Sequence, residues 1–170
     1  RPHDSQPHRA AEGRHEQPIA TDQDNGLVYT CAAKEAHLEQ DLLKFALEVN
    51  TALARCGYPL CKGKIMASNP ALCLSVEAWQ EKFMRWIESG DPQSLLSANI
   101  FFFLCALYGD ASLVERIVGR ISPLAQANVR FCKQMADNAL TNQPPLNWLG
   151  RIEGARVDLK RAGAMPFSDA

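Results

Sequence analysis

The sequence lacks both a long hydrophobic run and an excess of charge of one sign. Its longest apolar run, residues 100–107, is far shorter than the roughly 20 residues that span a bilayer. Residues 1–9 are polar, which is not typical of a signal peptide. Lys and Arg number 18 against 19 Asp and Glu, and the resulting net charge of −1 argues against a protein that binds bulk nucleic acid. We therefore expect no membrane partner, whereas a small anionic ligand such as a nucleotide is compatible with this charge.

Cysteine is present, but without the spacing of a metal or disulfide site. None of the six cysteines forms a Cys-x-x-Cys pair, and most lie in apolar surroundings. The four histidines precede most of the cysteines, whereas a zinc site needs ligands paired at short spacing. These patterns predict free thiols in a reducing, cytoplasmic location. The cysteines are Cys31, Cys56, Cys61, Cys73, Cys105 and Cys132.

Length and composition are those of one domain, or of one domain with a helical appendage. The 170 residues are 46% hydrophobic and 22% charged, an ordinary composition for a chain that buries its own core. We divide the chain into a polar arm at 1–9, a core at 10–90 and a helical region at 91–170. Because the first residue is not Met, we expect the chain to be a piece of a longer polypeptide.

Local patterns in the first half predict two short strands and two helices. Residues 26–31 are rich in β-forming residues, and residues 64–67 are a second candidate strand. Residues 35–56 carry apolar residues three and four apart, the period of an amphipathic helix. Ser75 is a predicted N-cap for a second helix that ends at Gly90. The apolar stripe expected on the first helix consists of Leu38, Leu42, Phe45, Val49, Leu53 and Cys56.

Helix caps organise the second half. Asp91, followed by proline, and Asp110 are predicted N-caps. Ser122 is also followed by proline and predicts the start of a further helix. The apolar run 100–107 either continues the helix that begins after Asp91 or switches to a buried strand, because a continuous apolar run fits both. Further predicted features are a helix break at 142–145 and a short strand at 155–159.

Two carboxylates stand two residues apart at the entry to the first predicted strand. On extended backbone, Asp22 and Asp24 project to the same face. Carboxylates so close together repel unless a cation lies between them, and Mg²⁺ (or Mn²⁺) prefers such hard oxygen ligands together with substrate phosphates. This is the apparatus of metal-assisted phosphoryl or nucleotidyl transfer. A bare Asp-x-Asp is also common in solvated loops, so the surrounding residues decide whether the pair indicates a metal site.

The longer string around the carboxylates resembles a known family. Gly13-Arg-His-Glu-Gln-Pro-Ile-Ala-Thr-Asp-Gln-Asp-Asn25 is similar to the motif of the bacterial signal-transduction nucleotidyltransferases, a DUF294-type family related to the N-terminal domain of protein-PII uridylyltransferase. Cys56-Gly-Tyr-Pro-Leu-Cys-Lys-Gly-Lys-Ile-Met-Ala-Ser-Asn-Pro70 continues the resemblance. It implies an α+β, helix-dominated fold in which a small mixed sheet of DNA-polymerase-β-like nucleotidyltransferase type precedes a C-terminal helical bundle.

The resemblance also implies a reaction, partners and site residues. The reaction is transfer of a nucleoside monophosphate from a nucleoside triphosphate to a hydroxyl acceptor with Mg²⁺, and in this family the acceptor is often on a protein, a PII-like protein being one candidate. CBS or cyclic-nucleotide-binding domains are expected in the parent chain. Asp22 and Asp24 are the implied catalytic and metal-binding residues. Gly13, Arg14 and Lys160 are the implied nucleotide-binding residues, although Arg14 equally suits a surface ion pair and Lys160 a solvated basic pair.

Three departures from the family pattern favour a different reading. Ala10 and Ala11 stand where the family has the Gly-Ser turn that cradles phosphates, and Phe103 stands where it often has a third carboxylate. These residues favour a degenerate nucleotide-sensing or protein-interaction module without catalysis. A helical interaction domain with an incidental Asp-x-Asp is the third hypothesis, since fold analogy alone does not establish function.

Overall fold

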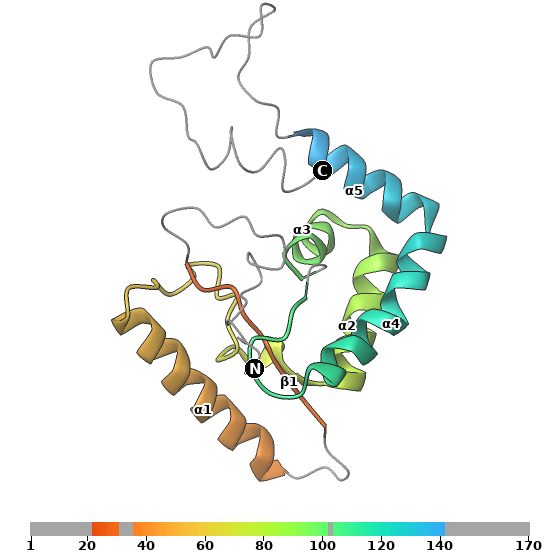
Figure 1. The fold of residues 1–170 in the computed structure, drawn as a ribbon. Helices are drawn as coiled ribbons and strands as arrows, with labels where there is room; N and C mark the ends of the chain where they lie inside the picture. The colour runs from red at the N-terminus through yellow and green to blue at the C-terminus, as the bar shows by residue number, and fades with distance from the viewer. Residues whose placement is uncertain (1–21, 31–35, 102–103, 142–170) are drawn as a thin grey trace, which may run out of the picture.

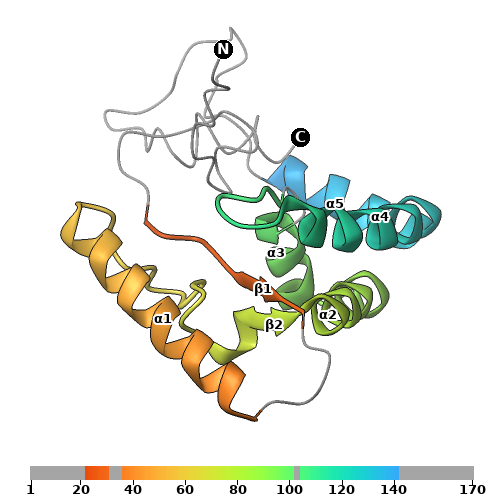
Figure 2. The ribbon, with the colours of Figure 1, turned by 60° about the horizontal axis from the view of Figure 1, so that its bottom comes forward.

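The computed structural model describes residues 22–30, 36–101 and 104–141, and these form a helix-dominated α+β fold, as predicted. Two short strands lie between α1 on one side and helices α2 to α5 on the other (Figures 1 and 2). The elements in chain order are β1 (Leu27–Tyr29), α1 (Ala36–Arg55), the 3-10 helix η1 (Pro70–Leu72), β2 (Cys73–Ser75), α2 (Val76–Ser89), α3 (Pro92–Phe101), α4 (Ala111–Ala127) and α5 (Val129–Thr141).

The two strands pair in parallel, with α1 in the connection between them. Leu27 lies opposite Cys73, and Tyr29 lies opposite Ser75. Parallel pairing requires a long crossover, which the segment containing α1 supplies. The predicted strand at 26–31 is thus confirmed. The predicted strand at 64–67 is wrong: the backbone there bonds to the segment before β1, and the second strand forms at β2 instead.

Helix α1 occupies the predicted range but turns a different face inward. Its most buried side chains are Ala46 and Asn50, at 2% and 1% exposure. Phe45 and Val49, from the predicted stripe, are 55% and 38% exposed. Successive helix positions are about 100° apart, so the contact face lies one position around the cylinder from the stripe. The buried side chain of Asn50, whose partners are described below, lies on this contact face.

The core lies among α2, α3, α4 and α5. Trp79 and Phe83 of α2 are at most 1% exposed. The Trp79 ring centroid is 5.4 Å from that of Phe101 in α3, and Phe83 meets Trp86 edge-on at 5.0 Å. The core of this helical layer is completed by Ile87, Ala98, Ile117, Ile121, Ala125 and Phe131.

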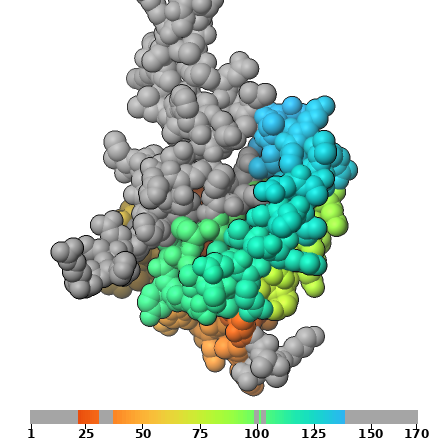
Figure 3. All heavy atoms as spheres, turned by 45° about the vertical axis from the view of Figure 1, so that its right-hand side comes forward, coloured from red at the N-terminus to blue at the C-terminus, as the bar shows by residue number. Residues whose placement is uncertain are grey.

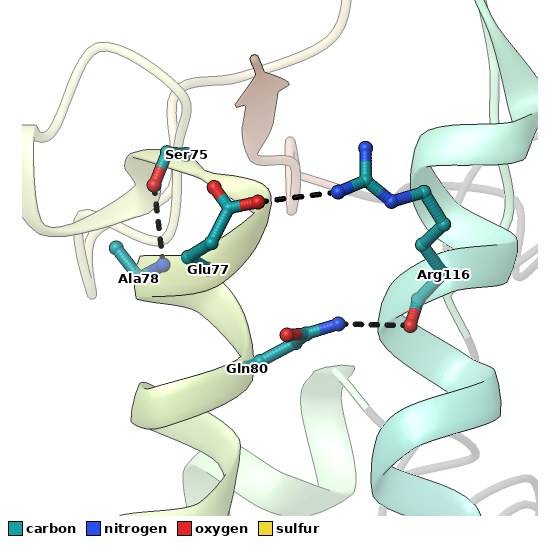
Figure 4. Close-up of polar contacts among 5 residues, drawn as sticks. All are labelled: Ser75, Glu77, Ala78, Gln80 and Arg116. Carbon is teal, nitrogen blue, oxygen red and sulfur yellow. Dashed lines mark hydrogen bonds and ion pairs between the residues drawn. The ribbon is translucent and has the colours of Figure 1, made fainter. Parts of the chain in front are cut away.

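Helices α2 and α4 lie side by side, and α4 with α5 forms the surface in front of α2 (Figures 1 and 3). Two polar contacts from Arg116 join α4 to α2 at the rim (Figure 4). Its guanidinium lies 3.2 Å from the Glu77 carboxylate, and its carbonyl accepts a 3.0 Å hydrogen bond from the Gln80 side chain. Because such an exposed ion pair contributes at most about 1 kcal/mol, the buried face between the helices carries the packing.

The predicted caps of α2, α3 and α4 are confirmed. The Ser75 side chain accepts from the Ala78 amide, and Gly90 ends α2 in the left-handed conformation at φ 63°. Asp91 accepts from the amides of Gln93 and Ser94, and the Asp110 side chain likewise caps α4. Local cap chemistry therefore begins these three helices, and a left-handed glycine ends α2, at the predicted residues.

The predicted helix start at Ser122 is wrong. Helix α4 runs through Pro123 to Ala127, because Ile117, Ile121 and Ala125 form one continuous buried face. Helix α4 ends before Asn128, whose side chain accepts from the Phe131 amide and donates to the Ile87 carbonyl. Hydrophobic continuity therefore outweighs the hydrogen bond lost at the proline.

The open question at residues 100–107 is resolved in part. Helix α3 ends at Phe101, and residues 104–107 adopt neither helix nor strand. The polar arm at 1–9, the break at 142–145 and the strand at 155–159 lie outside the described residues. In the part of the chain that the structure describes, no helix has the length and apolar character needed to cross a membrane.

Candidate functional site

The structure brings Asp22 and Asp24 together at the solvent-accessible edge that leads into β1. One oxygen from each carboxylate and the Cys61 Sγ all lie within 4.8 Å of one another. Cys61 comes from the loop after α1, so the cluster joins two segments far apart in the chain. Among the described residues, this is the one group of three or more His, Cys, Asp or Glu side chains close enough to hold a metal ion together.

The residues that alternate with the carboxylates point to the opposite side, into the protein. Gln23 is 5% exposed. Its side-chain amide donates to the carbonyls of Asn50, at 2.9 Å, and Tyr58, at 2.8 Å. The Asn25 Oδ1 accepts from the Ala67 amide at 2.8 Å. The period of two along extended backbone thus separates an outward carboxylate pair from an inward amide pair.

Asn50 of α1 links these two inward amides. Its Nδ2 donates to Gln23 Oε1 at 2.8 Å and to Asn25 Oδ1 at 3.1 Å. Its own Oδ1 accepts from the Ser68 amide at 3.1 Å. Every polar atom of this side chain therefore has a partner, as a buried amide requires. We call Gln23, Asn25 and Asn50 the amide network.

The backbone of the same segment is held by the loop after α1. The Gln23 amide donates to the Pro59 carbonyl at 3.0 Å, and the Asn25 amide donates to the Ile65 carbonyl at 3.1 Å. These bonds join Gln23 and Asn25 of the first string to Pro59 and Ile65 of the second. The second string, residues 56–70, supplies the carbonyl groups that hold the described part of the first string in place.

The start of β1 is fixed from the other side by Trp79. Its indole Nε1 donates to the Leu27 carbonyl at 3.0 Å. A Cβ on Gly26 would lie 2.9 Å from the Trp79 ring and 3.3 Å from the Leu72 carbonyl oxygen, so glycine is required for this close approach. The carboxylate segment is consequently held at both of its ends.

Burial raises the pKa of the Cys61 thiol, and the neighbouring Asp24 carboxylate, which accepts a hydrogen bond from that thiol, raises it further. The thiol therefore remains protonated at neutral pH and acts as a donor to Asp24. Two carboxylates are hard oxygen ligands that suit Mg²⁺ or Mn²⁺, whereas a sulfur atom suits softer metals. The donor set fits a divalent cation held by Asp22 and Asp24, with Cys61 beside it.

Other predicted site residues lie outside the described part of the chain. These are Gly13, Arg14 and Lys160, together with Ala10, Ala11 and Phe103.

Sequence reasoning missed Asn50, Gln23 and Cys61 as parts of this site. Asn50 carried one signal, an amide set among apolar residues at the spacing of the α1 contact face. That signal identifies a buried polar group but not its partner, which is 27 residues away at Gln23. Cys61 carried no signal beyond its place in the second string, because its approach to Asp24 depends on the fold of the loop.

A carboxylate pair at the entry to a small parallel sheet, backed by helices, is compatible with the nucleotidyltransferase type of domain that the sequence resemblance implies. Residues 11–93 match the family model described as "Putative nucleotidyltransferase DUF294". Residues 129–170 match the model described as "Putative nucleotidyltransferase substrate binding domain". The chain belongs to this DUF294-type nucleotidyltransferase family. Searches of curated proteins and of solved structures each found no significant match.

Proposed function

We propose that this chain binds a nucleoside triphosphate together with Mg²⁺ or Mn²⁺ at Asp22 and Asp24, and that its reaction is nucleotidyl transfer to a hydroxyl acceptor. The observation that carries the proposal is the approach of the two carboxylates to within 4.8 Å, inside the segment matched by the nucleotidyltransferase model. Like charges this close disfavour each other in water, and a divalent cation between them removes that cost.

In this proposal each residue has a limited role. Asp22 and Asp24 hold the cation, and Cys61 keeps Asp24 oriented by donating to its carboxylate. When bound, the cation neutralises charge on the phosphates and on the departing pyrophosphate. Gly13, Arg14 and Lys160 are proposed to contact the nucleotide, on the strength of the sequence resemblance.

The acceptor and the wider context are also proposals from the resemblance. A PII-like signalling protein is the acceptor class we propose, with CBS or cyclic-nucleotide-binding domains in the same polypeptide. The family match at residues 129–170, whose description names substrate binding, supports an acceptor site in the C-terminal part of the chain.

A second candidate function is nucleotide sensing without turnover. It is favoured by Ala10, Ala11 and Phe103, which replace a phosphate-cradling turn and a third carboxylate. Loss of a group that acts as a general base costs roughly 10²–10⁴-fold in rate, so binding would persist where transfer is lost.

Thermal unfolding tests the binding step that both candidates share. A ligand at 100 times its dissociation constant stabilises the folded state by about 2.7 kcal/mol. We expect Mg²⁺ with a nucleoside triphosphate to raise Tm, and the Asp22→Asn, Asp24→Asn double variant to lose the Mg²⁺-dependent part. The control double variant Asp41→Asn, Glu48→Gln removes the same charge from the exposed surface of α1 and should respond as wild type does. Equal shifts in all three proteins would refute the metal-bridged site.

Radiolabel transfer separates the two candidates. The intact chain is incubated with α-labelled nucleoside triphosphates, Mg²⁺ and a PII-type protein. Label transfer that is lost in Asp22→Asn supports the enzyme. Nucleotide-dependent stabilisation without label transfer supports the sensing module, because binding then occurs without reaction.

A further inference from the structure

We propose that Asn50 is a positioning residue for the carboxylate pair: through the amide network it holds Asp22 and Asp24 in a cation-ready arrangement before any cation binds. This inference rests on the proposed function, since it assigns a role toward the metal site. Asn50 lies on α1, outside both the metal-binding segment and the loop that carries Cys61.

The amide network holds the backbone on both sides of Asp24. Asp24 lies between Gln23 and Asn25, and both neighbours donate their backbone amides to the loop after α1. Both also bond through their side chains to Asn50 Nδ2, at 2.8 and 3.1 Å. The backbone on each side of Asp24 is therefore fixed, and the direction of its side chain is restricted accordingly.

The segment that carries Asp22 and Asp24 is subject to repulsion between the two carboxylates. Carboxylate oxygens within 4.8 Å repel each other, and an unrestrained segment would relieve that repulsion by rotating one residue away. Buried hydrogen bonds resist this rotation, because breaking them leaves unpaired amides inside the protein. Asn50, which is 1% exposed, is the residue of the amide network that hydrogen-bonds to both Gln23 and Asn25.

The amide network sets a chemical requirement at position 50. The side chain must donate twice, to Gln23 Oε1 and Asn25 Oδ1, and accept once, from the Ser68 amide. A primary amide satisfies this set completely. Alanine at this position removes all three bonds and leaves the carboxylates themselves unchanged.

The test measures Mn²⁺ affinity of the intact chain by electron paramagnetic resonance of free Mn²⁺, normalised to the folded fraction from circular dichroism. Loss of a partner that orients a metal ligand costs about 10–100-fold in affinity. We expect Asn50→Ala to weaken Mn²⁺ binding by that factor. The same substitution should have no effect on residual Mn²⁺ binding in the Asp22→Asn, Asp24→Asn background, because no carboxylate pair is left to position.

The matched control is Asn128→Ala. Asn128 is an amide less buried than Asn50, and its side chain likewise joins two elements, α5 and α2, but it takes no part in the amide network. Its substitution should lower stability and leave the Mn²⁺ dissociation constant within about twofold of wild type. If Asn50→Ala does not fold, Asn25→Ala and Asn25→Asp replace it. The alanine loses the Oδ1 acceptor and should weaken Mn²⁺ binding, whereas the aspartate keeps an acceptor at that position and should restore it.

The outcomes are distinguishable. If wild type binds Mn²⁺ through the two aspartates and folded Asn50→Ala binds it equally well, this inference is overturned and the proposed function stands. Where the Asn25 variants are used instead, unchanged binding in Asn25→Ala has the same meaning. Absence of aspartate-dependent Mn²⁺ binding in wild type overturns both. Equal weakening by Asn50→Ala and Asn128→Ala also overturns the positioning role, because a general loss of stability then explains the effect.

Discussion

Replacement of Gly26 by alanine tests whether the approach of β1 to Trp79 is as close as the structure shows. The added Cβ would lie 2.9 Å from the Trp79 ring, below ordinary van der Waals contact. The ring is 1% exposed and is held by its hydrogen bond to Leu27 and by its contact with Phe101. Since the ring has no room to move, the strand must shift.

Two destabilising effects and one stabilising effect set the change in unfolding free energy of Gly26→Ala. Overpacking of a rigid core costs about 1–3 kcal/mol. Weakening of the Trp79–Leu27 hydrogen bond adds about 1 kcal/mol. Alanine also restricts the unfolded chain, which returns roughly 0.4–1 kcal/mol. We expect Gly26→Ala to lower the free energy of unfolding by about 2 kcal/mol, a large part of the roughly 5–15 kcal/mol of a typical domain.

Urea unfolding followed by circular dichroism at 222 nm measures this loss. Gly119→Ala is the matched control, because Gly119 lies within α4 and a Cβ there meets no atom within 4 Å. Helix propensity predicts that this control is stabilised by up to about 1 kcal/mol. If Gly26→Ala were as stable as wild type, the close contact with Trp79 would be refuted.

Two further predictions concern helix ends and interiors. Hydrogen bonds from Ser89 and then Ser94 hold the pKa of the Asp91 carboxyl well below its usual range. A carboxyl whose pKa is lower in the folded than in the unfolded state stabilises the folded protein at pH values above the unfolded pKa of about 3.9. The Tm advantage of wild type over Asp91→Ala should therefore be present from pH 5 to 7 and shrink below about pH 4. An advantage that grows in acid would contradict this. Pro123→Ala should stabilise the protein by roughly 1–3 kcal/mol in urea unfolding, since α4 continues through this exposed position, and a loss of stability would show that proline is needed there.

The sequence predicted the elements whose signals are local. Ser75 and Gly90 bound α2 because a cap side chain and a left-handed glycine act on neighbouring backbone groups. Strand β2 escaped prediction because three residues carry little pattern, and its pairing with β1 is a tertiary event. The buried face of α1 escaped for a similar reason, since the hydrogen bonds that Asn50 makes on that face, to Gln23 and Asn25, are tertiary contacts.

The candidate site divides in the same way. The convergence of Asp22 and Asp24 follows from the period of two along extended backbone, so it was accessible from sequence. Asn50 and Cys61 were not, because their approach depends on how α1 and the following loop fold against the segment before β1. A local pattern can show a buried amide such as Asn50, but it does not show partners that lie 25 and 27 residues away.

The proposed function requires that Asp22 and Asp24 together hold a divalent cation. The most direct measurement is an anomalous difference map from crystals of this chain grown with MnCl₂ and a non-hydrolysable nucleoside triphosphate analogue. We expect a manganese peak at coordinating distance from one oxygen of each carboxylate, with the analogue's phosphates on the same ion. A nucleotide bound with no manganese between the two aspartates, or a peak held by one of them alone, would contradict it.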